Sequence, residues 1–150
     1  MNDEYTLTKT LNLPRIKSAG GLVYNDNYHI LLIFKRGKWD LPKGRFELDS
    51  DPVETALREI SEETGLDKGK LTIKGKLVST WHTTRYDKTK YLKKTNRYLV
   101  QYRGADSDVE PQYSEGIIEC RWVHLPDLDK YRPLLLPRKQ YVLAIWLQNM

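Results

Sequence analysis

The sequence predicts an α/β fold in which helices cover a mixed β-sheet. Two observations support this fold class. β-rich runs and helical patterns follow one another in the approximate order β-β-α-β-β-β-α, and a chain of 150 residues that is 39% hydrophobic suits one compact unit. No internal repeat, low-complexity segment or Gly/Ser linker divides the chain. We therefore expect residues 1–150 to form a single domain.

The first elements form a hairpin in this prediction. The β-rich runs 16–24 and 28–34 flank Asn25-Asp26-Asn27, whose residues tolerate the backbone of a tight turn. A turn-rich connection over 37–44 follows and leads toward the first helix.

That helix is expected over residues 52–64. Asp51 can accept hydrogen bonds from the first-turn amides, Pro52 suits the first helical position, and Gly65 suits a left-handed C-terminal cap. The later elements are expected to be strands over 71–81, 95–102 and 116–123, and a closing helix over 137–148.

Composition narrows the class of ligand. With 25 Lys and Arg against 20 Asp and Glu, the formal net charge is +5, which favours anionic ligands. The basic residues are spread along the chain, without an arginine-rich tract or an aromatic-basic RNA-binding signature, so a small polyphosphate is expected in place of a specific nucleic acid. The single cysteine, Cys120, excludes an internal disulfide, and no Cys/His cluster has zinc spacing.

The chain contains no apolar run of membrane-spanning length, and Met1-Asn2-Asp3-Glu4-Tyr5 lacks the layout of a signal peptide. These features predict a cytoplasmic protein without a membrane partner. A monomer or a homodimer is expected.

Three glutamates share one side of the 52–64 helix. Glu59, Glu62 and Glu63 point roughly 120° away from the apolar stripe that should rest on the sheet. Such carboxylates repel one another, and a hard divalent cation such as Mg²⁺ or Mn²⁺ makes their grouping favourable. An ordinary solvated helix face, with Arg58 paired to Glu62, is the alternative for an acidic patch alone. The apolar stripe consists of Val53, Ala56, Leu57, Ile60 and Thr64.

The spacing around these glutamates favours a functional site. The stretch Gly44-x13-Arg58-Glu59-Ile60-Ser61-Glu62-Glu63-Thr64-Gly65-Leu66 resembles the signature of the Nudix family, and its fixed positions match by accident with a probability on the order of one in a million. One position departs from the pattern, because Ser50 stands where the family has its first glutamate. The loss of that supporting carboxylate is expected to loosen metal binding.

The resemblance implies an α/β/α sandwich with a loop-helix motif, and it also implies roles for several residues. Glu62, Glu63 and the backbone carbonyl of Lys43 match metal ligands of the family. Glu59 matches a glutamate that either joins the metal ligands or acts as the general base. Arg58 would orient a neighbouring carboxylate by bidentate pairing.

The implied chemistry is attack of water on phosphorus, with a divalent metal neutralising phosphate oxygens and a carboxylate taking the proton. A second candidate for the base is Glu115, because family members often place a glutamate in the loop before a strand that ends like Trp122-Val123. Glu119 competes for this role, although a charge in the middle of a strand more often faces solvent.

Two segments point to a branch of the family. Trp39-Asp40-Leu41-Pro42-Lys43-Gly44 and Lys94-Thr95-Asn96-Arg97-Tyr98-Leu99 resemble segments of hydrolases of diadenosine polyphosphates and diphosphoinositol polyphosphates. By this likeness, Lys43 and Lys94 would contact phosphates and Tyr98 would line the groove. His82 is a candidate phosphate ligand or acid, with an exposed loop histidine as the alternative. Tyr86, Tyr91 and Trp81 are candidates for stacking on a base, with packing in the core as the alternative.

The resemblance therefore implies a Mg²⁺-dependent hydrolase, with Mn²⁺ as a possible replacement, that acts on a small phosphorylated molecule such as diadenosine tetraphosphate. Within this chemistry, a nucleoside triphosphate pyrophosphatase and a diphosphoinositol polyphosphate hydrolase are also compatible with the residues. A hypothesis of another class is a Nudix domain that senses a nucleotide without cutting it.

Overall fold

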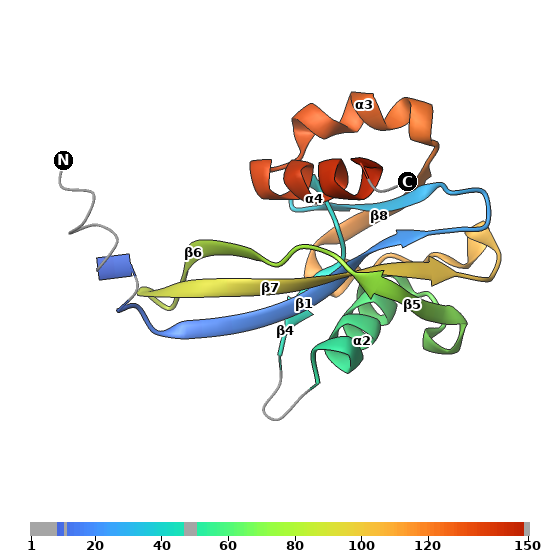
Figure 1. Ribbon diagram of the computed structural model, residues 1–150. Coiled ribbons are helices and arrows are strands. Elements are labelled where there is room, and N and C mark those ends of the chain that lie inside the picture. The colour runs from blue at the N-terminus through green and yellow to red at the C-terminus, as the bar shows by residue number, and fades with distance from the viewer. Residues whose placement is uncertain (1–8, 11, 47–50, 149–150) are drawn as a thin grey trace.

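The structure is a computed structural model that describes residues 9–10, 12–46 and 51–148. An eight-stranded mixed sheet lies at its centre, with one long helix on one face and two helices on the other (Figure 1). The predicted α/β class with a mixed, helix-covered sheet is confirmed. Ser50, the position that departs from the signature, lies outside the described residues.

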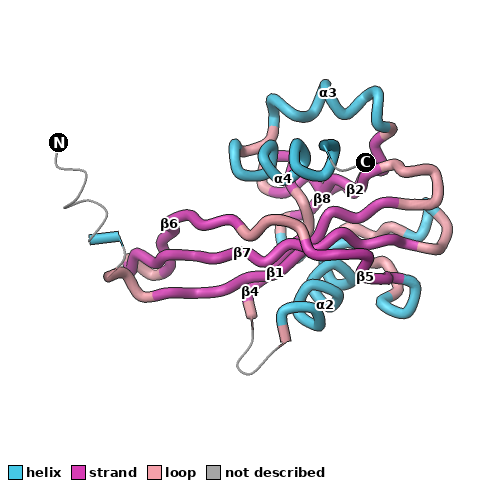
Figure 2. The backbone as a smooth tube through the Cα atoms, viewed as in Figure 1, coloured by secondary structure: helices cyan, strands magenta, loops and turns pink. Residues whose placement is uncertain are grey.

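The bounds of the elements are as follows. The strands are β1 (Arg15–Tyr24), β2 (Ile30–Lys35), β3 (Lys38–Asp40), β4 (Lys43–Arg45), β5 (Leu71–Lys76), β6 (Thr80–Tyr86), β7 (Thr89–Tyr102) and β8 (Ile117–Val123). The helices are α2 (Pro52–Thr64), α3 (Leu128–Tyr131) and α4 (Pro137–Gln148). The main path of the sheet runs β3-β2-β1-β7-β5, with β4 paired to β1, β6 to β7 and β8 to β2. The long pair β1 and β7 is parallel, and the other pairs are antiparallel. Figure 2 shows β1 and β7 lying side by side along the sheet.

Each face of the sheet has its own core. Under α2, the buried Ala56 and Ile60 of the helix contact Val23 and Val100 of the sheet. On the opposite face, Leu143 of α4 belongs to a second cluster that contains further residues of β1 and β2. Alternate residues of one strand therefore serve different layers, as the two-residue period of a strand requires.

The end caps of α2 agree with the prediction. The Asp51 side chain accepts a hydrogen bond from the Val53 backbone N–H at 3.4 Å, and Gly65 has the left-handed φ of 77°. The predicted helix over 52–64 and the closing helix over 137–148 are confirmed at the same bounds. The short helix α3 was not predicted.

The strand predicted over 71–81 is divided into two strands, and the region from 82 to 94, for which no strand is predicted, is also largely strand. The chain forms β5 and then β6, and β6 makes a tight hairpin with a β7 that begins at Thr89. The turn consists of Asp87 and Lys88, both with positive φ, at 48° and 69°. Lysine is an uncommon residue for this conformation, so the turn carries no sequence signal of the Asn-Gly kind.

The first hairpin is present, but it separates early. β1 and β2 pair at Tyr24 and Ile30, and β4 then pairs with β1 over Ser18–Gly20. The chain at Pro42 crosses so near Gly20 that an added Cβ would lie 2.2 Å from the Pro42 carbonyl oxygen. The connection predicted as turn-rich over 37–44 thus contributes two short strands to the sheet.

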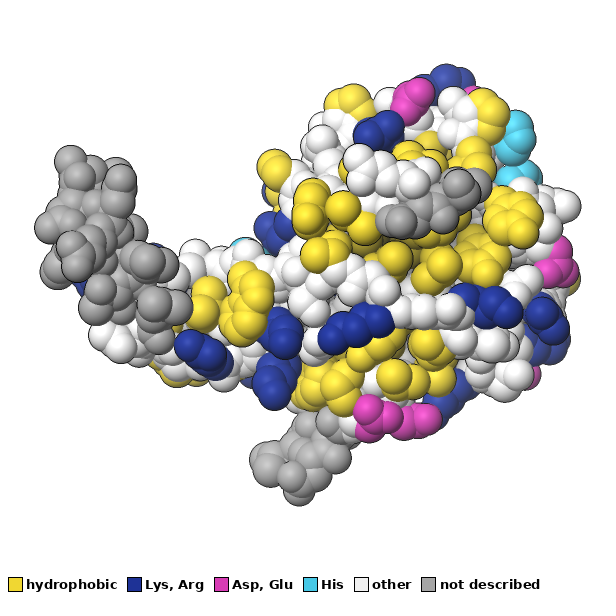
Figure 3. Space-filling model, viewed as in Figure 1, with side chains coloured by type: hydrophobic (Ala, Val, Ile, Leu, Met, Phe, Trp, Pro, Cys, Tyr) yellow, Lys and Arg dark blue, Asp and Glu magenta, His cyan; other side chains and the backbone are white. Residues whose placement is uncertain are grey.

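Lys and Arg side chains are spread along the face of the molecule seen in Figure 3, without forming one block. Among the helices of the described residues, none is long and apolar enough to cross a membrane.

Candidate active site

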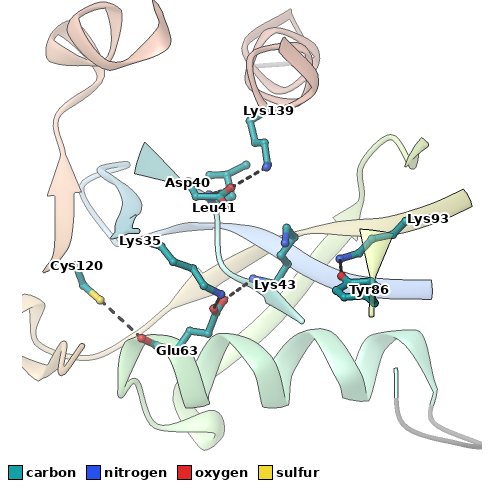
Figure 4. A network of polar contacts seen from close by, with 9 residues as sticks. All are labelled: Lys35, Asp40, Leu41, Lys43, Glu63, Tyr86, Lys93, Cys120 and Lys139. Atoms are coloured by element: carbon teal, nitrogen blue, oxygen red, sulfur yellow. Dashed lines mark hydrogen bonds and ion pairs between the residues drawn. The ribbon is translucent and has the colours of Figure 1, made fainter. Parts of the chain in front are cut away.

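A cavity of about 800 Å³ lies between α2, the β3–β4 segment, the β6–β7 hairpin and the start of α4. Its acidic lining residues are Asp40, Glu59, Glu62, Glu63 and Glu115. Its basic lining residues are Lys35, Arg36, Lys38, Lys43, Arg45, Lys93, Arg138 and Lys139. The acidic group comes mainly from α2, and the basic group comes mainly from the strands and α4. Figure 4 shows Glu63 of α2 with Lys35 and Lys43 directed toward it.

Glu63 is the buried member of the acidic group. Its side chain is 4% exposed, and its carboxylate accepts a 2.7 Å hydrogen bond from the Lys43 backbone N–H and a 3.0 Å bond from Lys35 Nζ (Figure 4). Burial raises the pKa of Glu63, whereas the charge of Lys35 and the hydrogen bond from Lys43 lower it. This carboxylate therefore fixes the segment before Gly44 against α2.

Of the three α2 glutamates that line the cavity, Glu59 and Glu62 are more exposed than Glu63. Burial, together with the charges of Glu62, Glu63 and Glu115, raises the pKa of Glu59 to about 6, against the lowering effect of Arg58. Arg58 Nη2 lies 3.3 Å from Glu59 Oε1, so Arg58 contacts a neighbouring carboxylate.

Gly44 leaves the space that Glu59 occupies. A Cβ at this position would lie 2.0 Å from Glu59 Cδ and 2.0 Å from its Oε2. The signature glycine is thus required by the close approach of a carboxylate, since any side chain here would displace Glu59.

The structure separates the two further candidates for the base. Glu115 lies in the 3-10 turn Tyr113–Glu115 before β8, and it lines the cavity. Glu119 lies within β8, forms an ion pair with Arg121, and is absent from the cavity lining within the described part of the chain.

In residues 9–10, 12–46 and 51–148, no group of three or more His, Cys, Asp or Glu side chains is already gathered around a metal position. The donor chemistry nevertheless fits a hard divalent cation. The charge of Glu62 raises the pKa of Glu59, and the carboxylate oxygen atoms of both residues are the ligand type that Mg²⁺ prefers. Together with Glu63, they are the residues that could hold such an ion.

Two lysines on the opposite side are almost fully buried. Lys139 of α4 is 2% exposed and lies 3.3 Å from Asp40 Oδ1, while Lys93 donates a 3.1 Å hydrogen bond to the Tyr86 hydroxyl (Figure 4). Burial lowers the pKa of both lysines to about 8. Arg45 lies over the Tyr86 ring at 4.5 Å from its centroid. This side therefore holds a concentrated positive charge that is poorly hydrated.

Of the predicted substrate-binding residues, Lys43 and Tyr86 line the cavity. Lys94 lies on the other side of β7, with its Nζ 5.6 Å from the centre of the Trp81 ring. Tyr98 is buried in the core under α2. His82, opposite Lys93 in the β6–β7 pair, is half-buried, and burial lowers its pKa to about 4, with nearby cations adding to the effect.

Cys120 is a free thiol whose Sγ lies 3.9 Å from the Glu63 carbonyl oxygen. Burial raises its pKa to about 12, which keeps the thiol protonated and unreactive.

Comparison with known proteins decides the family. A family model described as the NUDIX domain matches residues 14–145. The chain belongs to the Nudix hydrolase family. Nudix hydrolases generally use divalent metal cations, which agrees with the oxygen-rich acidic side of the cavity.

Two relatives illustrate the range of Nudix proteins that it resembles. It is 34% identical over 125 residues to the mutator protein MutT4 of Mycobacterium tuberculosis, covering 74% of this chain and 47% of that protein. The chain thus spans about half the length of MutT4. It is 26% identical over 148 residues to the RNA pyrophosphohydrolase of Rickettsia conorii, covering 88% of this chain and 87% of the relative.

Solved structures agree on the Nudix fold. An Ap4A hydrolase from C. elegans superposes with a TM-score of 0.67 at 21% identity, covering 89% of this chain and 96% of the other. A MutT protein from Methanosarcina mazei superposes with a TM-score of 0.62 at 24% identity, covering 92% and 97%.

Proposed function

We propose that this Nudix hydrolase uses Mg²⁺ to split a diphosphate linkage in a dinucleoside polyphosphate, such as diadenosine tetraphosphate. One observation carries the proposal. A single cavity sets the glutamates of α2 against a side that contains the buried cations Lys93 and Lys139. A polyphosphate chain is the small-molecule class that matches both sides, because it needs a divalent cation at the cut and many positive charges along its length.

The roles of the acidic residues follow from their surroundings. Glu59, Glu62 and Glu63, with the Lys43 carbonyl, would hold Mg²⁺, which when bound neutralises phosphate oxygens and lowers the barrier to attack by water. A Glu59 that does not serve as a ligand is suited to take the proton from water, because its pKa of about 6 leaves it ionised at neutral pH yet basic enough to accept a proton. Glu115, which lines the same cavity, is the second candidate for the base.

The basic residues would bind and orient the substrate. Lys43 and Lys93 offer ammonium groups to non-bridging oxygens, and burial strengthens such contacts by excluding water. Trp39 and Tyr86 place aromatic rings at the same cavity, where one of the two nucleosides can stack.

A second candidate substrate is a 5′-triphosphorylated RNA end. The observation that favours it is the resemblance over 88% of the chain to a protein named RNA pyrophosphohydrolase. Nucleoside triphosphates and diphosphoinositol polyphosphates are also candidate substrates, because they present the same charged phosphate chain.

A substrate panel tests the proposal. Purified protein with Mg²⁺ is incubated with diadenosine tetraphosphate, 5′-triphosphorylated RNA, nucleoside triphosphates and a diphosphoinositol polyphosphate, and kcat/KM is compared. We expect diadenosine tetraphosphate to rank first. A higher kcat/KM for any other substrate would replace it, and tight binding without turnover would favour a domain that senses nucleotides without cutting them.

Glu62→Gln is the matched variant for this assay. Glu62 lines the cavity and is exposed, whereas Glu63 also holds the backbone of Lys43 in place. The Glu62 change therefore removes a charge without disturbing the fold. We expect kcat to fall roughly a thousandfold, and unchanged turnover would exclude the assigned site.

A further inference from the structure

Buried hydrogen-bond donors without partners lie behind the basic side of the cavity. Within the described part of the chain, Arg97 Nη1 and Nη2, His82 Nδ1 and Arg138 Nε are all buried and have no hydrogen-bond partner. Arg97 is fully buried, at 0% exposed. Orphaned donors of this kind are rare in folded proteins, because each one loses its hydrogen bonds to water without replacement.

Strand register places these groups on one face. Lys93 pairs with His82 across the β6–β7 hairpin, and Thr95 pairs with Thr80. Arg97 follows Thr95 by two residues, so its side chain emerges on the same face of β7. Its Nε lies 3.4 Å from Thr80 Oγ1.

This face is the one that α4 covers. Leu99, the next residue of the same series on β7, packs in the core that contains Leu143 and Trp146 of α4. Arg138 stands in the first turn of α4 and also lines the cavity. The charge of Arg138 lowers the pKa of both Arg97 and His82, so the orphaned donors lie near one another and near the N-terminal end of a helix whose dipole favours an anion.

Charge in this region is unbalanced. Arg97, Arg138, Lys93 and Lys139 bring positive charges, and the carboxylate among them, Asp40, already pairs with Lys139. Burial lowers the pKa of Arg97 to about 10, and the charge of Asp40 opposes this effect. A buried guanidinium without a hydrogen-bonded counterion is costly, so the arrangement is suited to receive an anion.

We propose that Arg97, Arg138 and His82 form a phosphate subsite that takes a phosphate group beyond the diphosphate linkage cut at α2. The guanidinium forks offer paired N–H groups to non-bridging oxygens, and a neutral His82 offers one further N–H. The assignment of the bound phosphate chain to a substrate rests on the proposed function. The existence of an anion subsite does not depend on the proposed function.

Isothermal titration calorimetry of the whole chain in EDTA tests the subsite without hydrolysis. The probes are inorganic phosphate, pyrophosphate and tripolyphosphate. We expect tripolyphosphate to bind more tightly than pyrophosphate, and Arg97→Met and Arg138→Met each to weaken tripolyphosphate binding by about tenfold or more. Lys90→Met, which removes the same charge from the exposed tip of β7, should change binding by no more than about twofold.

Thermal unfolding without ligand adds an independent readout. Arg97→Met should be at least as stable as the wild type, because it removes an unpaired buried charge, and it should lose the stabilisation that tripolyphosphate gives the wild type. A less stable Arg97→Met that binds tripolyphosphate normally would overturn the subsite and assign Arg97 a structural role. If Arg97→Met fails to fold, normal tripolyphosphate binding by Arg138→Met overturns it.

Two further outcomes would also overturn the proposal. Equal weakening by Lys90→Met would mean that general charge, and not a built site, attracts the anion. Equal affinity for phosphate and tripolyphosphate would mean that the additional phosphate groups of the longer chain do not bind in the subsite. Failure of the wild type to hydrolyse diadenosine tetraphosphate with Mg²⁺ would instead remove the proposed substrate and leave the calorimetric result intact.

Discussion

The two sides of the cavity are built in different ways. The acidic side comes from one turn of α2, where Glu59, Glu62 and Glu63 lie within five residues. The basic side brings Lys93 of β7 and Lys139 of α4, residues that are far apart in the chain, to one cavity. The first side is fixed by helix periodicity, and the second depends on strand register and on the docking of a distant helix. A group of residues within one helix can therefore be predicted from a short stretch of sequence. The residues that would select the substrate come together only in the folded protein.

After the loss of activity expected for Glu62→Gln, the next largest effect concerns the fit between β4 and the acidic side. Gly44→Ala should displace the flexible end of Glu59, lowering kcat roughly a hundredfold while leaving the melting temperature within a few degrees of the wild type. Steady-state kinetics and thermal unfolding measure the two quantities. The control is Gly75→Ala, since nothing lies within 4 Å of a Cβ at that position. Normal turnover of Gly44→Ala would show that the position of Glu59 is unimportant.

The second effect tests the electrostatics of the acidic side. The pKa of Glu59 in the folded protein is raised to about 6 from 4.5, so its contribution to stability is fully present below pH 4.5 and is lost as pH rises through 6. For a side chain that is 18% exposed, we expect a loss of about 1–2 kcal/mol in the free energy of unfolding.

Denaturant titrations of the metal-free protein at a series of pH values from about 4 to about 8 measure this loss in the free energy of unfolding. Other carboxylates titrate in the same window, so the comparison is with Glu59→Gln, which should lack this part of the slope. If the free energy of unfolding changes with pH in the same way in the wild type and in Glu59→Gln, the pKa of Glu59 is not raised.

The third effect tests the basic side through two neighbours on β7. Lys93→Met should raise KM for diadenosine tetraphosphate about tenfold, because a buried ammonium that contacts phosphate is lost. Lys94→Met removes the same charge from the opposite side of the strand, and KM should stay within about twofold. A larger rise in KM for Lys94→Met than for Lys93→Met would show that the phosphate chain binds on the Trp81 side of the sheet.

The smallest effect concerns Tyr86, which joins Lys93 by a hydrogen bond and stacks with Arg45. Tyr86→Leu removes both contacts and keeps an apolar side chain. We expect KM to rise roughly two- to fivefold with kcat nearly unchanged. A large fall in kcat would move Tyr86 from substrate binding into the chemical step.

The sequence predicted most of the fold because several local signals agree. Asp51, Pro52 and Gly65 mark the ends of α2, and alternation marks the central strands. The β6–β7 hairpin was missed because Asp87 and Lys88 adopt left-handed backbone without the usual turn residues. Tertiary pairing along β7 stabilises this turn, and no short window of sequence contains that information.

The same division holds for the site. The signature glutamates and Gly44 were identified from spacing, and the structure brings them to one cavity. Lys94 was chosen from a motif, yet it is Lys93 that lines the cavity. One residue decides the face of a strand, so a prediction of the lysine required the register of β7. Lys139 gave no signal, because its role depends on where α4 docks.

Trp39 makes this cavity observable without a label. Its indole lines the cavity, lies 4.9 Å from the Arg121 guanidinium, and meets the Tyr131 ring edge-on at 5.2 Å between centroids. A cation and a polarisable ring so near an indole govern its fluorescence, and an entering anion would alter both the local field and access of water. Emission from Trp39, isolated by comparison with Trp39→Phe, therefore offers a direct optical record of ligand entry and product departure in real time.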